Sequence, residues 1–188
     1  TSALVKYSPI KQLTDQQVEL IKEVLDNGKT NYVINGDAGT GKTVLLTHLV
    51  AQFLNSEKDK SIAVVVQPNW IKTATEIFKV YGLNSSNLKI LSSTQLINLK
   101  QKFDTIIVDE SHKLSRRGSK QMASFNTVYN NPEFTTCETH LEPLIRLSNQ
   151  LILMYDVLQA IRPANIAREK FRELTSDFEQ RYLTTQFR

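Results

Sequence analysis

Cysteine is nearly absent from this sequence: Cys137 is the only one among 188 residues. A single cysteine excludes an internal disulfide and any zinc site built from several cysteines, and it suits a reducing compartment. Long apolar segments are also missing. The longest apolar runs, Ile62–Val66 and Leu151–Tyr155, have five residues each, whereas a membrane-spanning helix needs about 20. Because no secretion leader is recognisable either, the sequence predicts a soluble, cytoplasmic protein without a membrane partner.

Neither sign of charge is in large excess, because Lys and Arg outnumber Asp and Glu by only 23 to 19. The net charge of +4 permits a nucleic-acid partner without requiring one. The excess is unevenly distributed, since the stretch Ser111–Pro132 has no acidic residue and contains Lys113, Arg116, Arg117 and Lys120. This stretch is either a nucleic-acid contact or an ordinary solvated surface.

Glycine is scarce as well, with six in the chain. Three of them, Gly36, Gly39 and Gly41, lie within six residues of one another. Such a concentration indicates a segment whose backbone must take conformations that other residues disfavour. The three glycines belong to the run Gly36–Thr43, which satisfies the Walker A pattern G-x-x-x-x-G-K-[ST].

This pattern predicts a loop that binds phosphates. Its glycines let successive N–H groups point at the phosphates, and the helix that follows adds the positive end of its dipole. Lys42 would neutralise the β- and γ-phosphates, and the Thr43 hydroxyl would ligate Mg²⁺. The residues predicted to bind ATP are Gly36, Asp37, Ala38, Gly39, Thr40, Gly41, Lys42 and Thr43. The alternative is a glycine-rich turn without a ligand.

Short β-branched runs alternate with amphipathic stretches along the chain, a pattern typical of an α/β fold with helices covering a mostly parallel sheet. We expect strands at Tyr32–Ile34, Ile62–Val66, Leu88–Leu91, Phe103–Val108, Leu151–Tyr155 and Arg181–Thr184. We expect helices from Thr14 to Asn27, at Lys42–Leu54, at Ile71–Tyr81 and, in short form, after Thr94. The stretch Ser111–Gln150 is expected to be irregular and helical, without a strand.

A second motif follows the strand at Phe103–Val108, where two adjacent carboxylates end the run. A buried strand should deliver Asp109 at its carboxyl end, where open α/β sheets bind ligands. Asp109 could hold Mg²⁺ through water, and Glu110 could orient and deprotonate an attacking water. A carboxylate in this position favours nucleotide hydrolysis over a kinase reaction, which must exclude water. The alternative is a pair of acids that cap the next helix.

Further segments lie in a fixed order around these two motifs: Leu13–Gln17, Gln67–Trp70, Leu151–Gln159 and Tyr182–Arg188. This succession resembles the first RecA-like domain of a superfamily 1 helicase. The runs Asp109–Leu114 and Asp156–Gln159, the latter followed by Ile161-Arg162-Pro163, are most similar to the Schlafen group 3 DNA/RNA helicase-like family of P-loop proteins. The resemblance extends from Leu13 to Arg188.

The resemblance implies roles for further side chains. Gln17 would read the adenine edge, since an amide donates and accepts at once, although Thr14-x-x-Gln17 is also a capping box at a helix start. Gln159 would sense the γ-phosphate or the attacking water, with Asp156 as its link to the magnesium side. An ordinary strand-end turn is the alternative there. Arg188 would stabilise charge on the transferred phosphoryl group.

One segment departs from the family, in which threonines are usual where this sequence has Gln67–Trp70. Trp70 either stacks on a base or faces the core at the start of a helix. The identity of the strand contacts therefore stays open.

The combined expectation is a single RecA-like domain over residues 1–188 that binds ATP and Mg²⁺ and contains an irregular, helical segment at 111–150. It would be one half of a motor acting on single-stranded DNA or RNA, with the catalytic residues Lys42, Glu110, Gln159 and Arg188. A second motor domain is expected after Arg188, and alone the domain would hydrolyse ATP slowly. The alternatives are a nucleotide-gated nucleic-acid-binding switch without translocation and, disfavoured by Glu110, a P-loop kinase.

Overall fold

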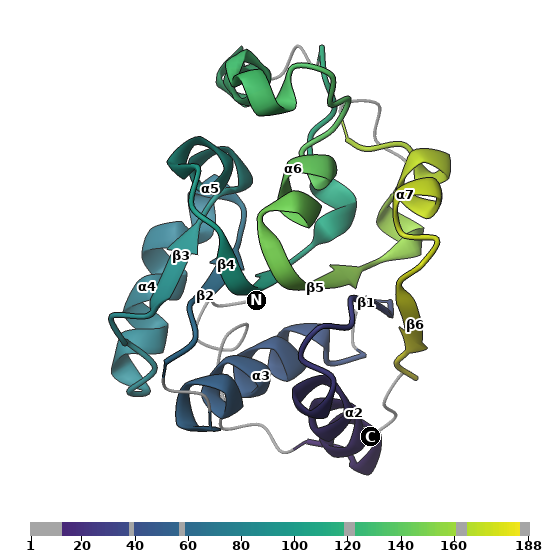
Figure 1. Ribbon diagram of the computed structural model, residues 1–188. Helices are drawn as coiled ribbons and strands as arrows, with labels where there is room; N and C mark the ends of the chain where they lie inside the picture. Colours follow the sequence, from purple (N-terminus) through teal and green to yellow (C-terminus); the bar gives the residue numbers. More distant parts are fainter. Residues whose placement is uncertain (1–12, 38–39, 57–58, 119–122, 161–164, 185–188) are drawn as a thin grey trace.

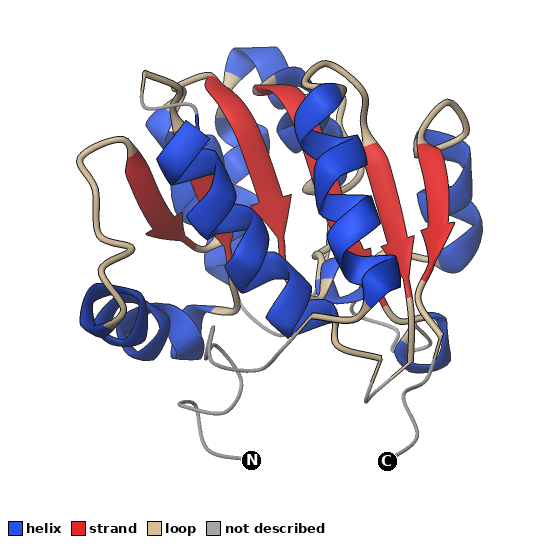
Figure 2. Cartoon of the chain, turned by 90° about the horizontal axis from the view of Figure 1, so that it is seen from below, coloured by secondary structure: helices blue, strands red, loops and turns tan. Residues whose placement is uncertain are grey.

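The computed structural model describes residues 13–37, 40–56, 59–118, 123–160 and 165–184. Within these ranges one sheet of six strands runs through the molecule (Figures 1 and 2). The strands are β1 (Tyr32–Asn35), β2 (Ile62–Val65), β3 (Leu88–Leu91), β4 (Phe103–Val108), β5 (Ser148–Tyr155) and β6 (Glu179–Tyr182). Their spatial order is β3-β2-β4-β5-β1-β6, and each neighbouring pair is parallel. The expected α/β fold with a parallel central sheet is confirmed.

Helices cover both faces of this sheet. The α-helices are α2 (Asp15–Asp26), α3 (Lys42–Ser56), α4 (Ile71–Val80), α5 (Ser93–Leu99), α6 (Leu141–Arg146) and α7 (Arg168–Leu174). Short 3₁₀ turns are η1 (Pro68–Trp70), η2 (Ser111–Lys113), η3 (Ala123–Asn130), η4 (Pro132–Phe134) and η5 (Val157–Gln159). No helix within the described ranges combines the length and the apolar character that crossing a membrane requires.

Two apolar layers hold the helices to the sheet, one on each face. In one layer the strands pack with α2, α3 and α4, through side chains such as Leu20, Leu45 and Phe78. In the other layer they pack with α5, α6 and α7, through side chains such as Leu144 and Phe171. In Figure 1 the first group of helices lies below and beside the sheet, and α6 and α7 lie above it.

Capping residues set the limits of α2. The Thr14 hydroxyl accepts a hydrogen bond from the backbone N–H of Gln17, and the Gln17 side chain accepts one in return from the backbone N–H of Thr14. This is the capping box that the sequence allows. The helix ends before Asn27, whose side chain donates to the Glu23 carbonyl at 2.8 Å.

The later part of the sheet differs from the sequence prediction. β5 begins at Ser148, inside the stretch expected to have no strand, and β6 begins two residues before the expected Arg181. Gln150 explains the first difference: this buried polar residue donates its amide to the carbonyls of Val24 and Asn27, at 3.1 and 2.9 Å. Satisfied hydrogen bonds make a polar residue compatible with a buried strand, a condition that hydropathy does not reveal.

Helix α7 was not expected at all. Phe171 is the only residue of this seven-residue helix that is fully buried, so its apolar face is too small to give a helical pattern. Outside β5, the described part of the stretch 111–150 is irregular and helical, as expected, with two isolated bridges at Ser115 and Arg116.

Candidate nucleotide site

The central parallel strands bring three polar segments to one edge of the sheet. The loop Gly36–Thr43 follows β1, Asp109 and Glu110 follow β4, and Asp156 follows β5. Because β4, β5 and β1 are neighbours in the sheet, their carboxyl ends lie side by side. Open parallel sheets bind ligands at such an edge.

The described part of the loop is held by its own backbone and by β5. The Gly36 N–H donates to the Tyr155 carbonyl at 3.1 Å. Thr40 donates to the Asp37 carbonyl through both its N–H, at 3.2 Å, and its hydroxyl, at 2.7 Å. A Cβ atom at position 36 would lie 2.4 Å from the Thr40 Oγ1 atom, so the close turn requires glycine. Gly41 has a φ of 86°, a value that glycine adopts without strain. Ala38 and Gly39 lie outside the described residues.

Lys42 lies across the loop, and its role in phosphate binding stays a prediction. Its Nζ atom donates to the carbonyls of Gly36 and Asp37, at 2.5 and 2.9 Å. Burial lowers the pKa of Lys42 below its usual value, and the carboxylates of Asp156, Asp37, Asp109 and Glu110 oppose this shift. Acidic groups from all three polar segments therefore interact electrostatically with this lysine.

Asp109 and Glu110 occupy different environments. Asp109 is only 5% exposed, and its N–H donates to the Val65 carbonyl at 2.9 Å. Glu110 has a left-handed backbone, with φ 55° and ψ 52°, which costs about 1 kcal/mol or more outside glycine. Its carboxylate pairs with Lys113 at 3.3 Å and makes no capping hydrogen bond to η2. The alternative of helix-capping acids therefore does not describe Glu110.

The oxygen donors here fit Mg²⁺. Thr43 lies in the first turn of α3, next to Lys42, and Asp109 lies at the end of β4. Among the described residues, no group of three or more His, Cys, Asp or Glu side chains could hold a metal by itself. Magnesium in nucleotide sites typically takes one or two protein oxygens, with phosphates and water completing its shell.

Asp156 and Gln159 form one hydrogen-bonded turn after β5. The buried Asp156 carboxylate accepts from the Leu158 N–H through Oδ1 and from the Gln159 side-chain amide through Oδ2, both at 3.0 Å. The capped turn that the sequence left as an alternative is present, and Gln159 is exposed within it. Its role as a γ-phosphate sensor stays a prediction.

Gln17 connects α2 with the loop. It is 1% exposed, and its Nε2 atom lies 3.5 Å from the Thr40 carbonyl and 3.4 Å from the Gly41 carbonyl. Its side-chain oxygen completes the capping box described above. The capping interpretation is thus confirmed, and adenine recognition by Gln17 stays a prediction. Arg188 lies outside the described residues.

Some of the residues that were considered for nucleic-acid contacts are engaged within the domain. Trp70 packs against the core layer around α4, as the core-facing alternative predicts. Arg117 donates to the carbonyls of Cys137 and Thr135 and lies 4.2 Å from the Tyr129 ring centre. Arg116 is exposed, and Lys120 lies outside the described residues.

Two buried residues that the sequence analysis did not select connect the carboxylate segments. The Ser111 hydroxyl donates to the Met154 carbonyl at 2.7 Å. The Nδ1 atom of His112 accepts from the Asp156 N–H at 3.3 Å, and burial lowers the pKa of His112. These bonds join the end of β4 to the end of β5. The only sequence signal was a polar Ser-His pair directly after two carboxylates.

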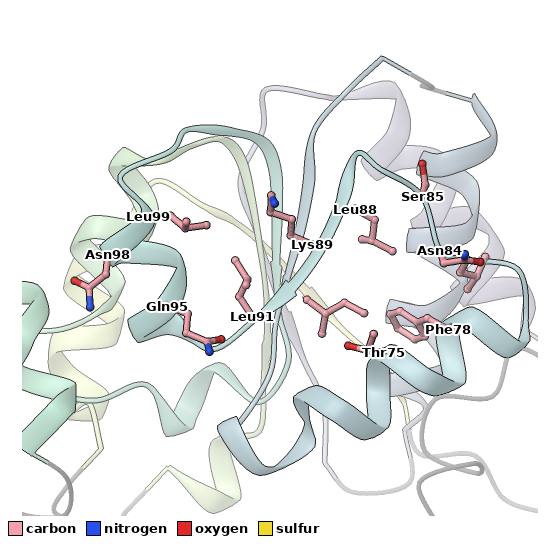
Figure 3. Close-up of a pocket in the computed structure, with 12 residues that line it drawn as sticks. Thr75, Phe78, Asn84, Ser85, Leu88, Lys89, Leu91, Gln95, Asn98 and Leu99 are labelled. Atoms are coloured by element: carbon pink, nitrogen blue, oxygen red, sulfur yellow. The ribbon is translucent and has the colours of Figure 1, made fainter.

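A cavity of about 600 Å³ at the β3 edge of the sheet is not part of this site (Figure 3). It lies between β3, α4 and α5, and none of the predicted site residues lines it.

Known proteins were compared with this chain by sequence. Residues 29–188 match the family described as Schlafen group 3, DNA/RNA helicase domain. The chain is 33% identical over 196 residues to the uncharacterized protein YPL245W of Saccharomyces cerevisiae, with 86% of this chain and 39% of that protein covered. The chain thus spans about two fifths of the length of the curated relative it matches.

Known structures were compared as well. The Sulfolobus solfataricus SWI2/SNF2 ATPase core in complex with dsDNA matches with a TM-score of 0.54 and 12% identity, over 97% of this chain and 47% of that one. AMPPCP-bound DnaA from Aquifex aeolicus matches with a TM-score of 0.52 and 13% identity, over 96% and 50%. At these identities the likeness shows the fold alone, which is that of RecA-like P-loop ATPases.

The family match covers β1 to β6, including the loop, the carboxylate pair and the turn after β5. This chain belongs to the Schlafen group 3 DNA/RNA helicase domain family.

Proposed function

We propose that this domain binds ATP with Mg²⁺ and hydrolyses it as one motor half of a helicase or translocase. Backbone N–H groups of the loop Gly36–Thr43, together with Lys42, would hold the phosphates. Magnesium, held by Thr43 and, through water, by Asp109, would neutralise charge on the β- and γ-phosphate oxygens. Glu110 would orient and deprotonate the attacking water. Gln159 and Arg188 would contact the γ-phosphate side.

One observation carries this proposal: the loop after β1, the carboxylates after β4 and Asp156 after β5 meet at one edge of the sheet, where Lys42 is held across the loop. Asp37, Asp109, Glu110 and Asp156 bring four carboxylates, whereas Lys42 and Lys113, which pairs with Glu110, bring two ammonium groups. A bare polyphosphate would be repelled there, whereas a polyphosphate that arrives with a divalent cation would find compensation on both sides. The site therefore suits magnesium-bound nucleotide better than free anion.

Nucleic acid is the proposed partner of the intact protein. The support is the family of this chain, a DNA/RNA helicase domain, and the fold that it shares with a SWI2/SNF2 ATPase core whose structure is in complex with dsDNA. Related motors hydrolyse nucleotide between two RecA-like domains. We therefore propose that residues 1–188 form one such domain and that a second one lies elsewhere in the protein.

Two substitutions test the ATPase proposal. Lys42→Ala should nearly abolish binding of a fluorescent ATP analogue, because it removes the charge that faces the phosphates. Glu110→Gln should leave binding intact and slow phosphate release by about 10²-fold or more, as expected for loss of a general base. Glu76→Gln, an exposed change on α4, is the matched control and should alter neither. Hydrolysis by Glu110→Gln at the parent rate would show that the assigned base is wrong.

Strand displacement by the intact protein distinguishes a motor from a nucleotide-gated switch. A motor should separate a labelled duplex with ATP and stop with the Glu110→Gln variant. A switch should change its affinity for a single strand with ATP and separate no duplex.

A further inference from the structure

A second cavity, of about 490 Å³, opens on the α7 side of the sheet. It lies where β5, β1 and β6 end, and Arg168 and Arg172 of α7 line it together with Tyr155 and the exposed Tyr182. Helix α7 packs on the face opposite α3, as Figure 1 shows. Of the loop residues that the structure describes, Gly36 and Asp37 line the cavity and Lys42 and Thr43 do not, so the cavity adjoins the proposed ATP site.

The charge of this cavity is positive. Arg168 and Arg172 are one helical turn apart on α7, whereas Asp37 is the one acidic residue among the described residues that line the cavity. Arg168 is positioned by a hydrogen bond from its Nη2 atom to the Val157 carbonyl at 3.2 Å. Arg172 is exposed, and within the described residues it forms neither a hydrogen bond nor an ion pair. Two guanidinium groups at this spacing can share one anion.

Tyr155 provides an independent observation. The residue is 4% exposed, its ring stacks on Phe171 at a centroid distance of 4.0 Å, and its hydroxyl has no hydrogen-bond partner among the described residues. Burial raises the pKa of this hydroxyl, and the charges of Arg168 and Arg172 oppose the shift more strongly than Glu169 and Asp156 add to it. The hydroxyl therefore lies in the field of both arginines.

A buried donor without an acceptor costs free energy, and the two arginines that line the same cavity favour an anion as the missing acceptor. We propose that the α7 cavity binds a phosphate group, with Arg168 and Arg172 as counter-charges and the Tyr155 hydroxyl as a hydrogen-bond donor. The group would be either a phosphodiester of a nucleic-acid strand, whose adjoining base could stack on Tyr182, or free inorganic phosphate. This site adds to the proposed function and does not depend on ATP binding at the loop.

The test uses the intact protein with Lys42→Ala, so that phosphate bound at the loop does not contribute. Arg172→Gln and Tyr155→Phe remove one group each from the cavity. Lys102→Gln, an exposed charge near the start of β4, and Tyr129→Phe, which removes another buried hydroxyl without a partner among the described residues, are the matched controls. Because the Tyr155 hydroxyl has no such partner, Tyr155→Phe should not lower the free energy of unfolding.

Two probes distinguish the sources of the phosphate. The first is labelled oligothymidylate, followed by fluorescence anisotropy, and the second is inorganic phosphate, followed as a rise in melting temperature at constant ionic strength. If the ligand is a strand, both cavity variants should weaken oligothymidylate binding by about tenfold. In addition, Arg172→Gln should reduce the slope of log affinity against log salt concentration by about one, since one phosphate contact is lost.

If the ligand is free phosphate, oligothymidylate binding should stay constant, and both cavity variants should lose the rise in melting temperature that the controls keep. Either pattern supports the site. Equal responses of cavity variants and controls to both probes would overturn it. Because the loop lysine is absent throughout, failure of this test is distinguishable from failure of the proposed ATPase.

Discussion

The carboxyl ends of β1, β4 and β5 differ from the β3 edge of the same sheet in their neighbouring strands, their buried polar groups and their charge. The first region is flanked by strands on both sides, and buried groups such as Asp109, Ser111 and Asp156 determine its hydrogen bonds. The second region has β2 as its one neighbouring strand. It borders a cavity of about 600 Å³ (Figure 3), and Lys89 is the one charged residue among the described residues that line this cavity.

The comparison shows that the size of a cavity does not locate the polar site of this domain. The larger of these two cavities is lined mainly by apolar and neutral polar side chains, with Lys89 as a charged one, whereas the strand ends hold several carboxylates and Lys42. Buried polar groups are costly unless they are satisfied, so their concentration at one edge is the stronger functional signal. Substitutions at the strand ends should therefore cost more affinity or stability than matched substitutions at the β3 edge.

The largest contrast is expected between two glycine substitutions. Gly36→Ala places a Cβ atom 2.4 Å from the Thr40 Oγ1 atom, so the loop must shift, and ATP affinity should fall by about 10- to 100-fold. Gly82→Ala lies between α4 and β3, where a Cβ atom meets nothing within 4 Å and φ is 73°. It should cost about 1 kcal/mol of stability through backbone strain and leave ATP affinity unchanged. Equal affinities of the two variants for a fluorescent ATP analogue would contradict this prediction.

An intermediate effect is expected for serine substitutions. Ser111→Ala removes the buried donor to the Met154 carbonyl and should lower the free energy of unfolding by about 2 kcal/mol. Ser85→Ala at the β3 edge removes an exposed hydroxyl that is bonded to the Asn87 side chain and should change it by less than about 0.5 kcal/mol. Urea unfolding measures both. A larger loss for Ser85→Ala than for Ser111→Ala would contradict the ranking.

The smallest effect concerns pH. Burial lowers the pKa of both His112, at the strand ends, and His140, whose Nδ1 atom bonds the Ser93 hydroxyl of α5 at 2.7 Å. The unfolded chain then binds more protons than the folded one below about pH 6.5, the usual histidine pKa. The stability that these residues contribute is therefore complete above that pH and is lost as pH falls toward their folded-state pKa values.

Substitution by glutamine separates the two histidines. Each substitution should reduce the slope of the unfolding free energy against pH, by at most about 1.4 kcal/mol per pH unit. Both variants should show this flattening, because burial is the largest cause of the lowered pKa at His112 and at His140. Urea unfolding between pH 7 and pH 5 checks this, and an unchanged slope in both variants would contradict it.

Much of the fold and of the candidate site could be predicted because the signals are local. The apolar, β-branched composition of runs such as Phe103–Val108 predicts a buried strand. The glycine spacing in Gly36–Thr43 predicts a phosphate-binding turn. The start of β5 could not be predicted, because Gln150 is compatible with a strand only through its bonds to the end of α2. Helix α7 was missed because one buried side chain, Phe171, gives no periodicity.

What the sequence determined by itself is a set of short segments, each able to form a strand, a helix or a phosphate-binding turn. Steric limits, hydrogen-bonding capacity and hydropathy act over a few residues and can therefore be read along the chain. The order β4-β5-β1 was decided only by tertiary packing. That order brings Lys42 near carboxylates from distant segments, links Ser111 to Met154, and lets Tyr155 and the arginines of α7 line one cavity. Long-range electrostatics and burial act only once the strands are side by side.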